Sequence, residues 1–480
     1  MRRRLELCSA ALALATSGLP AAPLLAQAPP SPDRPWSIPE SATQRAALLD
    51  QATSNGTVPK NRYDIVALID LAERTNPQTR GAWEAARAAA AAEGIVESSY
   101  LPQLSLDALG GFQHTPLPAP RNLVPKGYFE SNTREVIPSL SLKWLLFDFG
   151  QRDAQLEAAR AESFVANVAF TGAHQQVMFA VSQAYFDLGA ARGRLHAAEK
   201  ALQTALTTQD ATTAKRSNGL ATIVAVAQAE RQTAQSRYNL AAAQGVEKTA
   251  YASLVASLGI PAATKLEVAD SAELPLPAAP EPDVKAAIQQ ALVHRPDVIA
   301  ALGKLDSAEA GLKGTERSHY PVISLGAQAF QNIGALSSDG SPYSTIDRPG
   351  ANIMLSFSVP IYDGGLRASQ TSVARAKVRQ AEANLDETRD SAAQQVVRAY
   401  DGLVTSLAEY EAANALSSAA HTSYDAALRS YRQGVGTYTD LATEENAVVQ
   451  AETQVEDARA SAHTAAAALA FAMGTIGTAP

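Results

Sequence analysis

Cysteine, aromatic residues and long apolar runs are all scarce in this 480-residue chain. The one cysteine, Cys8, excludes a disulfide framework and a thiolate-rich metal site. No apolar stretch reaches the roughly 18 residues that a membrane-spanning helix needs. The net charge of −8 argues against a nucleic-acid partner, because proteins that bind nucleic acids present a basic surface.

Enzyme motifs are missing as well. The seven histidines show neither a His-x-x-x-His spacing nor the carboxylate clusters of a metal site. There is no Gly-x-Ser-x-Gly elbow and no phosphate-binding loop. Asp148-Phe149-Gly150 imitates a kinase motif but has no catalytic-loop counterpart. The sequence therefore predicts a protein that is not an enzyme and uses no cofactor or metal.

The chain is instead rich in alanine. Apolar residues make up 46% of it although aromatic residues make up only 6%, because alanine carries much of the apolar share. Long alanine-rich stretches without proline favour long helices that pack closely.

The N-terminus has the pattern of a secretory signal peptide. Arginines at positions 2–4 precede a short apolar stretch at 7–14, and small residues follow at 22–28. We assign residues 1–27 to the signal peptide and 28–61 to an N-terminal extension. Cys8 precedes the apolar stretch and follows Leu7 rather than a small residue, so we do not expect it to carry a lipid.

The chain is internally duplicated. The segment 100–106 returns at 319–325, with Pro102 matching Pro321 at an offset of 219 (321 − 102). Later matches have an offset of 215, as for Asp148 and Asp363 (363 − 148). The difference of four residues falls between positions 102 and 148, where we expect a loop. Further pairs at 215 are Gly219 with Gly434, Thr222 with Thr437, and Gly259 with Gly474.

Both copies have the same order of expected elements, a helix, two strands and a long helix with a return helix. We place the first repeat at 62–260, a linker at 261–284, the second repeat at 285–475 and a short tail at 476–480. The first helices of the two repeats are expected at 62–98 and 285–318.

The expected strands alternate with period two, which indicates sheets with one apolar face. The loops within the strand pairs, 114–134 and 332–350, are polar and rich in proline and glycine, and we expect them outside the cell. Four strands cannot close a membrane barrel alone, because such barrels have eight or more. The apolar positions are Leu104, Leu106, Ala108 and Phe112; Leu140, Leu142, Trp144 and Leu146; Ile323, Leu325, Ala327 and Ala329; and Ile353, Leu355, Phe357, Val359 and Ile361.

Long helices are expected at 151–217 and 366–433, with Asp148 and Asp363 as caps. About 67 residues at ~1.5 Å per residue span on the order of 100 Å. The return helix, 222–258, is about half as long, so 62–98 is expected to stack on its end. The long helices carry heptads with a large residue at one position and a small one at the other, typical of close coiled-coil packing. They comprise Val181, Leu188, Leu195 and Leu202 with Ala184, Ala191, Ala198 and Ala205, then Val396, Leu403 and Tyr410 with Ala399, Ser406, Ala413 and Ala420.

Together these features resemble the TolC-like outer-membrane efflux protein (outer-membrane factor) family over nearly the whole mature chain. The resemblance rests on the duplication, on the run Leu-Ser-Phe-Ser-Val-Pro-Ile-Tyr-Asp-Gly-Gly at 355–365, and on two helix-hairpin tips at 218–222 and 433–437. It implies an α+β membrane protein with a long antiparallel α-helical coiled-coil barrel. Four strands per chain would contribute to a 12-stranded β-barrel in a homotrimer.

The resemblance also implies a function and partners. The protein would be the outer-membrane channel of a tripartite efflux or type I secretion system, surrounded by outer-membrane lipid and extended far into the periplasm. Export would be passive, because an inner-membrane pump supplies the energy. A periplasmic adaptor (membrane fusion) protein would dock on the tips. The residues implied in docking are Gly219, Leu220, Thr222, Gly434, Val435, Gly436 and Thr437.

Three acids just beyond the second tip, Asp440, Glu444 and Glu445, are candidates for a periplasmic gate. In a threefold assembly they would form rings of negative charge that attract cations. The alternative is an acidic helix start stabilised by the helix dipole. The first tip has Ala225 and Ala229 at the positions of Asp440 and Glu444, and this asymmetry favours the gate.

A different class of protein also fits the heptads. An exported periplasmic coiled-coil scaffold without a pore would show the same helical pattern, but it would not need the amphipathic strands.

Overall fold

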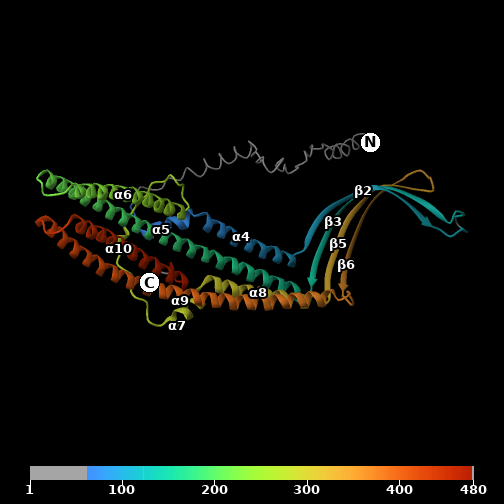
Figure 1. Ribbon diagram of the computed structural model, residues 1–480. Coiled ribbons are helices and arrows are strands. Elements are labelled where there is room, and N and C mark those ends of the chain that lie inside the picture. The colour runs from blue at the N-terminus through green and yellow to red at the C-terminus, as the bar shows by residue number, and fades with distance from the viewer. Residues whose placement is uncertain (1–61, 123, 478–480) are drawn as a thin grey trace. The chain divides into compact units, whose positions relative to one another are not determined.

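The computed structural model describes residues 62–122 and 124–477. The expected signal peptide at 1–27, the extension at 28–61 and residues 478–480 lie outside this part of the chain. Within it, the duplicated order of helices and strands expected from the sequence is present (Figure 1).

The first expected helix of each repeat is in fact two helices. α3 (Ile65–Thr75) ends before Pro77, where α4 (Pro77–Glu97) begins. α7 (Val284–His294) and α8 (Pro296–Arg317) break in the same way. Proline lacks the backbone N–H that an α-helix needs, and it disfavours helical backbone at the residue before it.

A two-stranded parallel sheet joins the start of the first repeat to the segment between the repeats. β1 (Arg62–Tyr63), expected as helix, pairs with β4 (Glu267–Val268). The short 3₁₀ helix η2 (Ser271–Glu273) follows β4. Arg459 donates hydrogen bonds to the carbonyl oxygens of Ala272 and Leu274, which holds this segment against the last helix of the chain.

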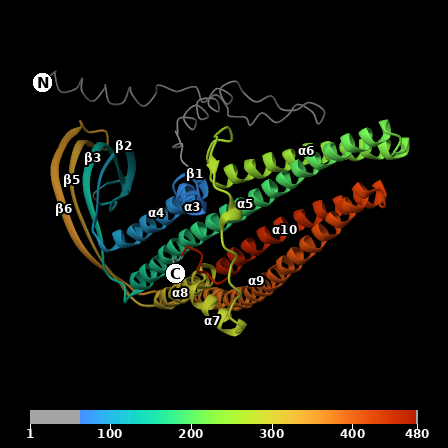
Figure 2. The ribbon, with the colours of Figure 1, turned by 90° about the vertical axis from the view of Figure 1, so that its left-hand side faces the viewer.

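The long helices lie where the sequence predicts them. They are α5 (Gln151–Ser217) with its return helix α6 (Ile223–Ser257), and α9 (Leu366–Gln433) with its return helix α10 (Tyr438–Ala472). Each long helix packs against its return helix, α5 against α6 and α9 against α10. α5 also contacts α4 and α8, the second short helix of each repeat, and α9 also contacts α8 (Figures 1 and 2).

The predicted end-to-end stacking of α6 on the first pair of short helices is confirmed. The Thr75 hydroxyl and the Asn76 side-chain amide donate hydrogen bonds to the carbonyl oxygens of Leu258 and Ser257, at 2.7 and 2.8 Å. Gly259 follows with φ +69°, and a Cβ there would lie 2.7 Å from the Cα of Asn76. Only glycine satisfies both the left-handed backbone and this close approach.

The second repeat has the same joint with different polar groups. Gly474 has φ +73° and lies against the backbone of His294 and Arg295. Arg295 is buried and donates a 3.1 Å hydrogen bond to the carbonyl oxygen of Ala472 at the end of α10. Each joint therefore ties a return helix to the break between two short helices.

The heptads form the helical core as expected. Val181, Leu188, Val396 and Leu403 are buried, as are most of the small residues at the other heptad position. Leu195, Leu202 and Tyr410 are only partly buried. Among the described residues, no helix combines the length and the apolar character needed to cross a bilayer.

The four strands form one antiparallel sheet in the order β2-β3-β5-β6. β2 (Gln103–Pro118) and β3 (Tyr128–Phe147) are longer than expected, as are β5 (Val322–Ser338) and β6 (Ser344–Ser358) at their shared turn. The expected loops 114–134 and 332–350 therefore shrink to 119–127 and 339–343. Prolines suggested loops, but Pro116 and Pro349 lie on the edge strands, where a missing N–H is tolerated. At its other end β6 stops at Ser358, before Pro360, so Val359 and Ile361 lie beyond it.

The register gives the sheet two different faces. Leu104, Leu142, Ala327 and Ile353 are direct neighbours across the four strands and so lie on one face. The next row, Ser105, Ser141, Gln328 and Asn352, lies on the opposite face. In these rows the alternation expected from the sequence extends across all four strands, apolar on one face and polar on the other.

The joint at Gly259 makes a specific prediction about stability. We expect Gly259→Ala to lower the free energy of unfolding by about 1–3 kcal/mol, because the methyl group meets backbone and the left-handed conformation is strained. Gly245→Ala inside α6 is the control, because a Cβ there meets nothing within 4 Å, and alanine should raise stability by roughly 0.5–1 kcal/mol. Chemical denaturation followed by circular dichroism measures both. Equal effects of the two substitutions would contradict the close approach at the joint.

Candidate functional site: the helical tips and the strand–helix junctions

The first tip is a tight turn between α5 and α6. Gly219 adopts φ +73°, and its N–H donates to the carbonyl oxygen of Arg216. The N–H of Leu220 donates to Lys215, which completes the helix end. Thr222 then caps α6 by accepting a 3.1 Å hydrogen bond from the N–H of Ala225.

The second tip repeats this geometry between α9 and α10. Gly434 has φ +82°, and the N–H groups of Val435 and Gly436 donate to the carbonyl oxygen of Ser430. Thr437 caps α10 and forms a capping box with Asp440, in which each side chain accepts from the backbone of the other. The two tips therefore have the same type of turn, in which a glycine takes the left-handed conformation and a threonine caps the next helix.

At both tips, apolar side chains are exposed and one glycine has free space beside it. Leu220 and Val435 are 77% and 79% exposed. A Cβ at Gly219 or Gly434 would meet nothing within 4 Å. The predicted tip residues are thus brought to two matching, accessible turns, and Ile223 and Val224, which the sequence analysis did not single out, add exposed apolar surface to the first one.

The three candidate gate acids lie in three different environments on α10. Asp440 is exposed, and hydrogen bonds from the hydroxyl and N–H of Thr437 lower its pKa below the usual value. Glu444 lies one turn further on and is partly buried. Glu445 is only 4% exposed, and burial raises its pKa to about 7. Asp440 therefore carries its charge at the tip, and it also supports the helix start.

A polar contact that the sequence analysis missed joins the two hairpins near the tips. The hydroxyls of Thr212 on α5 and Tyr431 on α9 are 2.8 Å apart and buried. Lys215 donates a 2.7 Å hydrogen bond to the carbonyl oxygen of Tyr431, with its Nζ 3.9 Å from the ring centroid. Tyr431 also packs with Tyr438, Leu441 and Ala229. These residues are far apart in sequence, and no local motif marks the contact.

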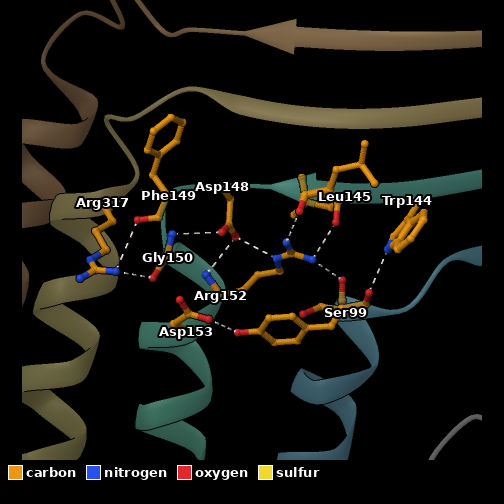
Figure 3. Close-up of polar contacts among 11 residues, drawn as sticks. Ser99, Trp144, Leu145, Asp148, Phe149, Gly150, Arg152, Asp153 and Arg317 are labelled. Carbon is orange, nitrogen blue, oxygen red and sulfur yellow. Dashed lines mark hydrogen bonds and ion pairs between the residues drawn. The ribbon is translucent and has the colours of Figure 1, made fainter.

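At the opposite end of α5, a buried ion pair connects the sheet to the helix (Figure 3). Gly150, and not Asp148 as expected, is the N-cap residue of α5, but the Asp148 carboxylate accepts hydrogen bonds from the N–H groups of Gly150 and Arg152. The same carboxylate accepts a 3.0 Å bond from the Arg152 side chain, and both side chains are 8% exposed. A carboxylate and a guanidinium buried this deeply stabilise the junction only as a pair.

Arg152 also ties together the backbone around the junction. Its guanidinium donates to the carbonyl oxygen of Ser99, in the short 3₁₀ helix η1 (Ser98–Tyr100) that follows α4, and to those of Leu145 and Leu146 in β3 (Figure 3). Arg317 at the end of α8 donates to the carbonyl oxygens of Phe149 and Gly150. Asp363 and Arg367 repeat the ion pair at the start of α9, but there the side chains are about a quarter exposed.

The difference in burial between the two ion pairs predicts different costs of mutation. We expect Arg152→Met to lower the free energy of unfolding by about 3–5 kcal/mol, because Asp148 is left charged and buried without a partner. The matched Arg367→Met should cost clearly less, because solvent screens the more open Asp363. Denaturant titration of the two variants in detergent checks the order. A smaller loss for Arg152→Met than for Arg367→Met would contradict it.

Known proteins resemble this chain in sequence and in fold. Protein CyaE of Bordetella pertussis is 28% identical over 361 residues, which cover 74% of this chain and 72% of that protein. The outer membrane efflux protein BepC of Brucella suis is 26% identical over 336 residues, covering 70% of this chain and 71% of that protein. The crystal structure of CusC superposes with a TM-score of 0.72 at 20% identity, covering 88% of this chain and 96% of that one.

Both repeats also match a family description directly. The family is named "Outer membrane efflux protein", and the match covers residues 68–260 and 287–475. The matched segments contain the strands, the long helices and both tips. The chain therefore belongs to the outer membrane efflux protein family.

Proposed function

We propose that this protein is the passive outer-membrane duct of a tripartite efflux or type I secretion system and works as a homotrimer. Family membership already makes it an outer-membrane efflux channel with a long periplasmic helical extension. The observation that carries the finer proposal is the combination of an open four-stranded sheet at one end of the helices with paired, exposed tips at the other.

The sheet supports a trimer because it has two open edges. β2 and β6 are the outer strands, and each pairs with one neighbour only among the described residues. Unpaired backbone groups cannot face lipid, so a spanning sheet has to close on itself. Strands of 15–20 residues exceed the 9–11 needed to cross a bilayer. Three chains of four strands supply twelve (3 × 4), enough for a closed barrel.

Cysteine cross-linking tests this closure. Within one chain β2 and β6 are three strand spacings apart, about 14 Å, which is too far for a disulfide. We therefore expect a cysteine at Leu106, combined in turn with cysteines along β6, to give an oxidised covalent trimer on denaturing gels at one register. Leu106→Cys with Leu140→Cys, which face each other within the chain, is the control that gives no cross-linked oligomer. Failure of every β2–β6 pair would contradict the shared barrel.

The tips support docking of a periplasmic adaptor. Gly219 and Gly434 leave room for a close approach, and Leu220 and Val435 offer apolar side chains that nothing in the described chain covers. Two equivalent turns per chain give six docking positions in a trimer (2 × 3). In this proposal Gly219, Leu220 and Thr222 act together with Gly434, Val435, Gly436 and Thr437.

Asp440, Glu444 and Glu445 are proposed to form the periplasmic gate. The exposed carboxylate of Asp440 is ionised at neutral pH, and three copies would place like charges around one axis. The contact of Tyr431 with Thr212 and Lys215 would hold the two hairpins together when the gate is closed. The duct supplies the path, and an inner-membrane pump would supply the energy.

Single-channel recording tests the gate. We expect Asp440→Asn with Glu444→Gln to weaken the preference for cations and the block by multivalent cations, because the ring loses its charge. Asparagine keeps an oxygen that can accept from Thr437, so the helix start should remain intact. Asp425→Asn on the exposed face of α9 is the control. Unchanged selectivity and block in the double variant would mean that these acids only cap the helix.

A further inference from the structure

Glu445 is the least expected buried group in the helical hairpins. It lies on α10, which packs against both α5 and α9. The side chain is 4% exposed, and neither carboxylate oxygen has a hydrogen-bond partner among the described residues. An unpaired carboxylate is costly in such a place, and a buried acid takes up a proton instead.

Aromatic and apolar side chains lie next to Glu445, and polar and charged ones line the cavity beside it. Tyr424 of α9 and Tyr438 of α10 lie close enough that Glu445 contributes, after burial itself, to raising the pKa of both hydroxyls. A cavity of about 370 Å³ between α5, α9 and α10 adjoins it, and Val448 and Val449 form part of the wall. Both carboxylate oxygens are closed to solvent, so this cavity does not hydrate them.

Other charged groups around this position come from all four helices. α9 contributes His421, which pairs with Glu452 of α10 at 3.2 Å, and Arg432, which acts on Tyr424. α5 contributes Lys200 at the cavity, and α6 contributes Arg231, which acts on Tyr438. No ion pair joins Glu445 to any basic group in the part of the chain that the structure describes. The carboxyl therefore lacks a counter-charge in this packed arrangement.

The internal duplication supplies a comparison within the same chain. Glu230 on α6 corresponds to Glu445 (445 − 215), and it is exposed. One repeat thus keeps this acid in water and the other buries it between hairpins. The burial is a property of the α9–α10 hairpin and is not required by the shared fold.

We propose that Glu445 is a proton-dependent latch that holds the α9–α10 hairpin against α5 when its carboxyl is protonated and releases it when the carboxyl ionises. Ionisation in place would leave a bare charge among Tyr424, Tyr438 and the valines. Separation of the hairpins lets water reach the carboxylate and removes that cost. The release of the hairpin does not depend on the proposed channel function. Only its consequence, a tip that opens more readily as the pH rises, rests on that proposal.

The direction of the effect follows from linkage. Burial raises the pKa of Glu445 from its ordinary value of 4.5 to about 7 in the packed arrangement. The packed arrangement binds the proton more tightly, so it is favoured at low pH and loses stability as the pH rises from about 4.5 to about 7. Between pH 5.5 and 7.5 we expect the ratio of separated to packed hairpins to rise on the order of tenfold per subunit.

Spin labels at Ala227→Cys on α6 and Ser423→Cys on α9, both exposed positions, measure the separation. The only native cysteine, Cys8, lies in the predicted signal peptide and does not interfere. We expect the distance distribution of the full-length protein in detergent to shift to longer values from pH 5.5 to pH 7.5. Glu445→Gln should stay at the short distance at both pH values, because the amide is neutral.

Two further variants make the test decisive. Glu230→Gln should shift with pH as the unchanged protein does, because Glu230 is already in water. Glu445→Met is a second neutral replacement if the amide disturbs packing, and it should also stay short. The latch is wrong if the neutral variants still shift with pH, or if the unchanged protein does not shift. The distance needs no ion current, so failure of the channel proposal in recordings is a separate outcome.

Discussion

The joints at Gly259 and Gly474 are the constraint on which the helical part of this protein depends. A helix as long as α5 has buried residues along its whole length, whereas its return helix covers only about half of it. The second short helix of the same repeat covers the remainder, provided that it begins where the return helix ends. Glycine allows the two backbones to approach to within van der Waals distance, and proline ends one short helix and begins the next at that point. A continuous helical wall follows from these two residue types.

The functional segments lie at the two ends of this wall, and each end is fixed by backbone capping. At the sheet end, Arg152 donates to the carbonyl oxygens of Leu145 and Leu146 in β3 and is itself held by Asp148, so the direction of the strands is coupled to the start of α5. At the tip end, threonines and glycines set the turns that we propose as docking surfaces. The long helices between them carry small residues at the seams, which keeps the hairpins in close contact.

The two repeats share their backbone design but differ in buried charge. The junction ion pair is closed to solvent in the first repeat and partly open in the second. The joint uses Asn76 in the first repeat and the buried Arg295 in the second. Near the tips, Glu230 is in water whereas Glu445 is buried without a partner. The two repeats of this chain thus keep the residues that set backbone geometry. The buried charged side chains differ, and such a difference lets one hairpin respond to pH where the other does not.

The sequence by itself determined the duplication, the long helices, the alternating strands and both tip turns, because each depends on local periodicity or on glycine, proline and threonine at fixed positions. It misplaced the loops 114–134 and 332–350, because proline on an edge strand looks the same in sequence as proline in a loop. Only the tertiary structure decided the environments of the acids near the second tip. Asp440, Glu444 and Glu445 are chemically alike and nearly adjacent, yet one caps a helix in water and another is buried between hairpins. Burial depends on helices that are distant in sequence, and so does the contact of Tyr431 with Thr212, which no local pattern can encode.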